Sequence, residues 1–346
     1  MNQPDSTQAV QRLTALWAFS EAGLGGILHA LNMPFKGLIL SSVTAICITM
    51  IAHNAPNRTA ILRSLLVVLI VKAAVAPNSS PASYFALGFQ GVAGYLLFSM
   101  FSGIRIPALL LTTLAVTYSS VQKVIVAYLL YGEPLVRIIT KFSNFALKFF
   151  GAEEQPDIAL WLIGAYVGIH TVSGVIIGLF AGTLPRRIEL ERCEALNIAP
   201  AEDAAQAARS PGVRHKVLFF LLLPLGILLL FAIIFPDAPE ESAVEIALIL
   251  ARVLCVLVLW YGVIAGFAMT VVRRALQRKR LHYAAEVEHV LLMLPALRRY
   301  IFPVWRSTDT HGGFRRIAGA SARFIALVLC LPLSNPEQPN NERSSG

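Results

Sequence analysis

The chain has 346 residues, of which 56% are hydrophobic and only 14% are charged, whereas soluble domains average about 45–50% and about 25%. This composition excludes an ordinary soluble domain and, at about 20 residues per span, allows about six to nine transmembrane helices. The net charge of +9 does not indicate nucleic-acid binding, because the basic residues cluster beside apolar segments, as in cytoplasmic anchors. We expect an all-α, polytopic integral membrane protein with no nucleic-acid partner.

Six apolar segments precede a basic linker at 183–216, and they cover about 13–30, 37–53, 60–75, 84–101, 106–131 and 158–181. Two more, 217–235 and about 243–272, follow the linker and flank a loop that is acidic and free of Lys and Arg. Because basic loops stay in the cytoplasm, the linker and the amino terminus are predicted to lie inside. Two of the outer loops also carry Lys or Arg, which counts against this rule. Tyr128, Tyr131 and Trp161 nevertheless fall at the outer interface, as an aromatic belt requires.

The remaining segments are too short or too polar to span. Residues 134–150 place apolar side chains at helical spacing among Arg137, Lys141 and Lys148, a pattern typical of an interfacial helix. The apolar part of 313–333 is too short to span, which favours an interfacial or protein-packed helix. The predicted division is a six-helix bundle (1–187), a cytoplasmic linker (188–216), two further spans (217–272), a basic amphipathic and interfacial region (273–333) and a disordered tail (334–346).

Polar side chains inside the spans are candidate site residues, because burying them in a bilayer costs several kcal/mol unless they face protein or water. Most fall in the outer half of their spans, and we expect them to contact a ligand in a pocket open to the exterior: His29, Lys72, Asn78, Tyr84, Gln90, Gln122 and Lys123. Glu21 and His170 lie deeper. Lys123 lies about 12 Å from the outer end of its span, at about 1.5 Å per residue, and favours a ligand that carries a carboxylate or phosphate.

Structural explanations for the same residues stay open. Lys72 could extend its ammonium to the interface, Glu21 could be a neutral carboxyl that joins helices, and the glutamines could bond across helices. Two stripes of small residues have the same ambiguity: Ala22, Gly26 and Ala30 in the first span, and Gly174, Gly178 and Gly182 in the sixth. Such stripes let helices pack closely, either within the chain or against another subunit.

Catalytic and metal motifs are missing. The sequence has no G-x-S-x-G around Ser173, no H-E-x-x-H and almost no aspartate in the spans. The four cysteines (Cys47, Cys193, Cys255 and Cys330) have no paired spacing. We expect no enzyme, no cofactor and no metal. Residues 1–11 lack the basic segment of a cleaved signal peptide, so we expect the first span to be retained.

The first half of the chain, about Leu13 to Arg187, resembles a substrate-binding S component of energy-coupling factor (ECF) vitamin transporters. The resemblance rests on six short helices with an inside amino terminus, on the stripe Ala22, Gly26 and Ala30, and on the stretches 33–37, 76–86 and 89–91. It implies a vitamin-like ligand beneath the loop 76–83. It also implies that the stripe packs on a separate T component driven by ABC-type ATPases.

The second half departs from that family, whose members end after six helices. The sequence has no Walker A motif, so ATP hydrolysis would need another polypeptide. We expect a transport protein of the bacterial inner membrane that binds a small solute from outside. The alternatives are a proton-coupled secondary transporter with Glu21 and His170 as proton carriers, and a membrane scaffold that recruits a cytoplasmic partner through 273–300.

Overall fold

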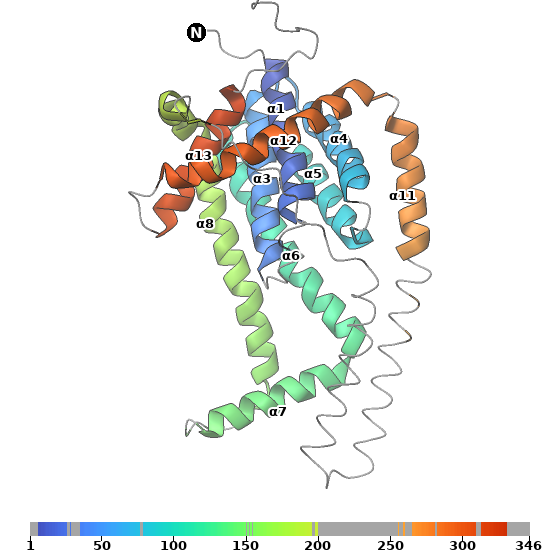
Figure 1. Cartoon of the computed structure of the whole chain (residues 1–346). Helices are drawn as coiled ribbons and strands as arrows, with labels where there is room; N and C mark the ends of the chain where they lie inside the picture. The colour runs from blue at the N-terminus through green and yellow to red at the C-terminus, as the bar shows by residue number, and fades with distance from the viewer. Residues whose placement is uncertain are drawn as a thin grey trace, which may run out of the picture.

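Every described element of the computed structural model is a helix (Figure 1). The structure describes residues 6–25, 28, 35–76, 79–149, 151, 153, 155–195, 198–199, 255, 259, 265–280, 282–308 and 313–330. The elements are α1 (Ser6–Phe19), the π-helix η1 (Ser20–Leu24), α3 (Lys36–Asn54), α4 (Thr59–Val75), α5 (Pro81–Met100), α6 (Arg105–Tyr131), α7 (Glu133–Phe149), α8 (Ile158–Ala195), α11 (Ala265–Arg280), α12 (Ala284–Arg306) and α13 (Gly313–Cys330). The all-α prediction is confirmed for this part of the chain.

The six apolar segments predicted before the linker each overlap a helix, but two bounds differ: the first helix begins at Ser6 instead of 13, and α8 continues past 181 to Ala195, into the predicted linker. The first becomes α1 and η1, and the next five become α3, α4, α5, α6 and α8. The predicted interfacial segment 134–150 becomes α7. The span predicted at 217–235 lies outside the described residues, and the span at 243–272 is described only at Cys255, at Leu259 and from Ala265 onward.

Three of these helices are long and apolar enough to cross a membrane, namely Lys36–Asn54, Arg105–Leu129 and Ile158–Glu191. α6 and α8 also expose large apolar side chains along their lengths, including Leu114, Ile169 and Leu179. Exposed apolar surface on this scale is unfavourable in water and marks contact with a membrane or another protein. Both observations indicate a membrane-associated protein.

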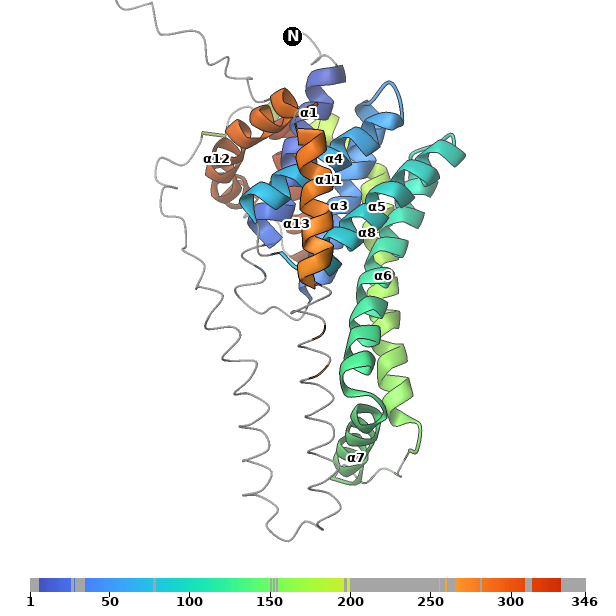
Figure 2. The same cartoon turned by 90° about the vertical axis from the view of Figure 1, so that its right-hand side faces the viewer.

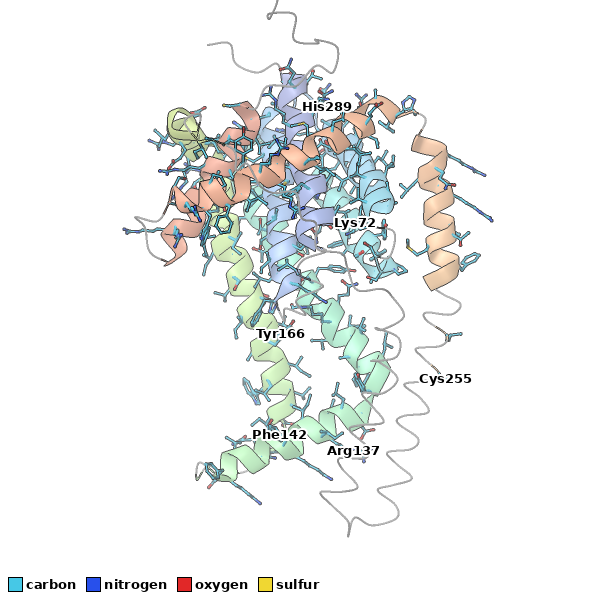
Figure 3. All side chains as sticks on the ribbon, viewed as in Figure 1. Lys72, Arg137, Phe142, Tyr166, Cys255 and His289 are labelled. Carbon is cyan, nitrogen blue, oxygen red and sulfur yellow. The ribbon has the colours of Figure 1, made fainter. Side chains whose placement is uncertain are left out.

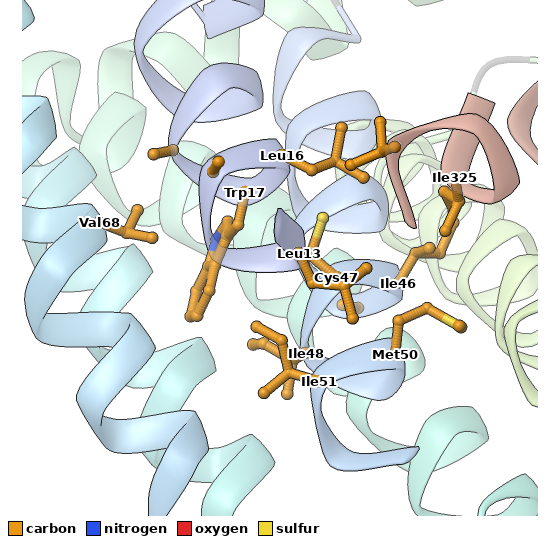
Figure 4. Packing of buried hydrophobic residues seen from close by; sticks show 14 of the residues in the cluster. Leu13, Leu16, Trp17, Ile46, Cys47, Ile48, Met50, Ile51, Val68 and Ile325 are labelled. Carbon is orange, nitrogen blue, oxygen red and sulfur yellow. The ribbon is translucent and has the colours of Figure 1, made fainter. Parts of the chain in front are cut away.

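The core lies where α1 passes between α3 and α4 (Figure 4). Trp17 and Leu13 of α1 are fully buried there, together with Ile48 and Ile51 of α3 and Val68 of α4. Each such side chain contributes about 1.5–3 kcal/mol when it leaves water. This cluster fixes the position of η1, which continues α1 and carries Glu21.

α6 and α8 pack along each other and extend beyond the core to α7, which lies across their far ends (Figures 1 and 2). The glycines of α8 explain the close packing. A Cβ on Gly178 would lie 2.8 Å from Cα of Leu109, and one on Gly174 would lie 2.9 Å from Cα of Thr113. The stripe of the sixth predicted span therefore packs within this chain.

At the opposite end, where α1 begins, α12 crosses α1, and α13 packs against α8 (Figure 1). Val290 and Leu297 of α12 are buried, as are Ala326 and Val328 of α13. Of the two possibilities for 313–333, the described residues thus form a protein-packed helix. The buried Arg12 of α1 donates a hydrogen bond to the carbonyl of Leu329, in the last turn of α13.

Candidate functional site

One face of α3 gathers polar side chains from three other elements. Gly37, Ser41 and Thr44 are spaced four and three residues apart, and residues at this spacing share a helix face. Their contacts are with Ser119 and Lys123 of α6, with Gln90 of α5 and with Glu21 of η1. We call this set, together with Lys72 of α4, the α3 polar site.

The centre of the α3 polar site is an ion pair between Glu21 and Lys72. Nζ of Lys72 lies 2.6 Å from Oε2 of Glu21, and only 4% and 5% of the two side chains, respectively, are exposed. The hydroxyl of Thr44 donates a hydrogen bond of 2.7 Å to Oε1, so both carboxylate oxygens have a partner. Tyr84, which is also buried, places its ring centre 5.7 Å from the ammonium of Lys72.

A π-helical turn carries Glu21. The N–H of Gly25 bonds to the carbonyl of Ser20, five residues back, and the hydroxyl of Ser20 bonds to the carbonyl of Trp17 at 2.8 Å. Single π-helical turns are rare, and those that do occur are often found at functional sites. Here the wide turn follows the apolar core of α1 and carries the carboxylate that contacts Thr44 of α3 and Lys72 of α4.

Burial determines the energetics of this pair. The attraction between two charges in the interior offsets their desolvation only when the geometry is good, so the pair adds little net stability compared with apolar residues. Removing one partner leaves a lone buried charge and is strongly destabilising. The buried pair is therefore weak evidence of a stabilising role for these two residues.

Gln90 contributes a buried acceptor to the α3 polar site. Its Nε2 donates to the hydroxyl of Ser41 at 3.1 Å, whereas its Oε1 has no hydrogen-bond partner among the described residues. An unsatisfied buried oxygen costs about 1–3 kcal/mol. A ligand with an N–H or O–H group would satisfy it.

A second cationic region adjoins the first turn of α3. A Cβ on Gly37 would lie 3.1 Å from the hydroxyl of Ser119 and 3.5 Å from Cε of Lys123, so α6 passes close to this position and a larger residue would require Ser119 to shift slightly. Lys36 is close enough to Lys123 for the two positive charges to interact. Two neighbouring ammonium groups favour an anion between them. Gln122, the residue before Lys123, is half-buried on α6.

His170 lies on α8 and is fully buried. Its Nδ1 is 2.9 Å from the carbonyl of Tyr166, and its ring contacts the rings of Tyr166 and Phe35. Its Nε2 has no hydrogen-bond partner in the described part of the chain. Figure 3 shows Tyr166 farther along the molecule toward α7 than Lys72.

Not every predicted residue can be placed. His29, Asn78, Gly26 and Ala30 lie outside the described residues. Ala22 is buried within this chain. Glu21 and Lys72, predicted as a deeper group and a ligand contact, respectively, contact each other directly.

The sequence interpretation missed Ser41 and Thr44, which bond to two of the predicted residues. The available signal was their spacing from Gly37, which predicts a small, polar stripe on an otherwise apolar span. Among the described residues, no group of three or more His, Cys, Asp or Glu could hold a metal ion.

Comparison with protein-family models, with curated proteins and with solved structures gave no match. The function of this chain is therefore inferred from its own residues and their geometry.

Proposed function

We propose that this protein is a polytopic transport protein of the bacterial inner membrane, which captures a small anionic solute from its outer side. One observation carries the proposal: polar and charged side chains of η1, α5 and α6 converge on one face of the apolar helix α3, and Lys72 of α4 pairs there with Glu21 of η1. Burying so many polar groups at bilayer depth is costly, and a binding site is the usual reason.

The proposed orientation places α7 outside and the start of α1 inside. It is supported by three basic residues at or near the first turns of α4 and α6, on the side of the molecule where α1 begins: Arg58, Arg63 and Arg105. It is also supported by Tyr128, Tyr131 and Trp161, which are exposed near α7, as residues of an aromatic belt would be. α7, with its apolar face and cationic side chains, would lie in the outer interface.

The solute in this proposal has two chemical requirements. A carboxylate or phosphate would bind beside Lys123 and Lys36, because it offsets the repulsion between their charges. A donor group would bind Oε1 of Gln90. The pair of Glu21 and Lys72 would then be the element that rearranges, because a ligand anion competes with Glu21 for the ammonium.

Partner subunits would supply the energy, as the resemblance to S components implies. However, α12 of this chain packs on α1. The resemblance implies that α1 packs instead on a separate T component. We therefore infer that α12 and α13 form the cytoplasmic face on which an ATPase-bearing partner would act.

Native mass spectrometry of protein released from lipid nanodiscs tests the proposal. Wild type should retain a small anionic molecule, Lys123→Ala should lose it, and Lys141→Ala should keep it, because Lys141 is exposed on α7. Equal retention by the two variants, or a wild type that carries only lipid, would contradict solute capture at this site.

A second candidate, proton-coupled transport, is favoured by one observation. The buried Glu21 and the open Nε2 of His170 are both groups that can exchange a proton. Uptake by proteoliposomes without ATP, driven by a pH gradient and lost in Glu21→Gln, would favour this candidate. Uptake that requires a co-purified ATPase would favour the first.

A further inference from the structure

A groove of about 1100 Å³ lies near the end where α1 begins, away from the α3 polar site. It is lined by three segments, 102–106 at the start of α6, 182–191 of α8 and 318–322 of α13. The close approach of Gly182 to Arg105 joins two of its walls, since a Cβ on Gly182 would lie 3.1 Å from Cα of Arg105.

The lining is strongly basic. Arg105, Arg186 and Arg187 all contribute to it, and all three are exposed. Arg186 lies four residues after Gly182 and therefore on the same face of α8. Three guanidinium groups thus border one groove, where their charges reinforce each other.

The acidic residue in the groove does not neutralise these charges. Glu191 pairs with Arg323 of α13 at 2.6 Å, which leaves its carboxylate occupied. No carboxylate of the described residues forms an ion pair with Arg105 or Arg186. Arg187 lies over the ring of Phe180, with the guanidinium 5.5 Å from the ring centre.

The groove also has apolar borders that lead away from the arginines. Ile106 and Leu190, both among its lining residues, are exposed. Farther along α6, toward α7, the exposed Leu110 and Leu114 continue the apolar surface from Ile106 at helical spacing. A ligand with an anionic head and hydrocarbon chains matches both parts.

We propose that this groove binds the phosphate headgroup of an anionic membrane lipid, with the acyl chains along α6. Guanidinium groups bind phosphate through paired, charge-assisted hydrogen bonds. Basic pockets between helices on the cytoplasmic side are suited to such headgroups. The inference uses the membrane orientation proposed above, but it is independent of solute capture.

The test uses the full chain in nanodiscs that contain equal amounts of phosphatidylglycerol and phosphatidylcholine, followed by native mass spectrometry. Wild type should retain phosphatidylglycerol preferentially. The double variant Arg105→Gln and Arg186→Gln should weaken this preference about tenfold or more, since each basic residue near the surface contributes about 1 kcal/mol.

Two further variants separate the groove from general surface charge. Arg274→Gln with Arg278→Gln removes two exposed arginines of α11 and should leave the preference unchanged. Arg105→Lys with Arg186→Lys keeps the charges and should lose less than the glutamine variant. Equal losses in the α11 and groove variants would overturn the proposal, as would no lipid preference in wild type. Displacement of the lipid by millimolar inorganic phosphate would identify a soluble-phosphate site instead.

The outcome does not depend on the small solute, because lipid and solute differ in mass and are detected separately. If wild type carried the lipid but no small solute, only the proposed transport function would be refuted.

Discussion

Breaking and then removing the buried ion pair of Glu21 and Lys72 provides the sharpest test of the α3 polar site. The variants are Glu21→Gln, Lys72→Met and the double variant that carries both changes. Gln at position 21 retains an oxygen for the hydroxyl of Thr44, and Met fills the space of the lysine stem without charge. The three variants therefore differ mainly in whether a lone charge stays buried.

The expected free energies follow from the geometry. The pair is direct at 2.6 Å, and both side chains are about 95% buried. Each single change should lower the free energy of unfolding by about 3–5 kcal/mol, because it leaves one uncompensated buried charge. The double variant should be close to wild type or more stable. The coupling energy between the two positions is then at least about 6 kcal/mol, the sum of the two single costs.

The measurement is equilibrium unfolding in mixed micelles, followed by circular dichroism, for the complete double-mutant cycle. A surface pair in the same chain gives the matched control. Glu133 and Arg137 on α7 lie 3.7 Å apart with more than half of each side chain exposed, and their coupling should be only about 0.3–0.5 kcal/mol. If the Glu21 and Lys72 changes add to within about 0.5 kcal/mol, the reasoning about burial is refuted.

Three further changes test the packing and the site. Gly178→Ala places a Cβ against the α6 backbone and should destabilise the protein by about 1–3 kcal/mol, whereas Gly168→Ala, which has open space, should be neutral or stabilising in thermal unfolding. Arg12→Met removes the hydrogen bond to the carbonyl of Leu329 and should lower the free energy of packing α13 by about 1–3 kcal/mol. Limited proteolysis should then release α13 faster, and an unchanged cleavage rate would contradict this role. Gln90→Leu should leave the unfolding temperature within a few degrees but abolish retention of the proposed solute, and retained solute would remove Gln90 from the site.

The presence of the helices before the linker was predictable from the sequence, because each contains a long apolar run, but apolar length did not predict the polar first turns of α1 or the polar end of α8. The expected segment 134–150 and the observed α7, Glu133–Phe149, differ by a single residue at each end. The pairing of polar side chains was less predictable. Glu21 and Lys72 are 51 residues apart, and nothing local to either residue specifies its partner.

Glycine spacing gave an ambiguous signal for the same reason. The stripe at Gly174, Gly178 and Gly182 predicted a close helix contact, but only the three-dimensional arrangement identifies α6 as the neighbour. The short apolar part of 313–333 was similarly undecided, because its burial comes from α8 and α1, which are remote in sequence.

The glycine contacts between α6 and α8 also limit how the molecule can move. The Cα atoms of Leu109 and Thr113 on α6 lie against glycines of α8. If one helix slid along the other, larger side chains of α8 would clash with the α6 backbone at these positions. In the proposed transport cycle, the two helices are therefore expected to move as one rigid body. Any opening of the proposed site would then come from the shorter α1, α3, α4 and α5. A covalent cross-link between α6 and α8 should therefore leave the proposed cycle intact.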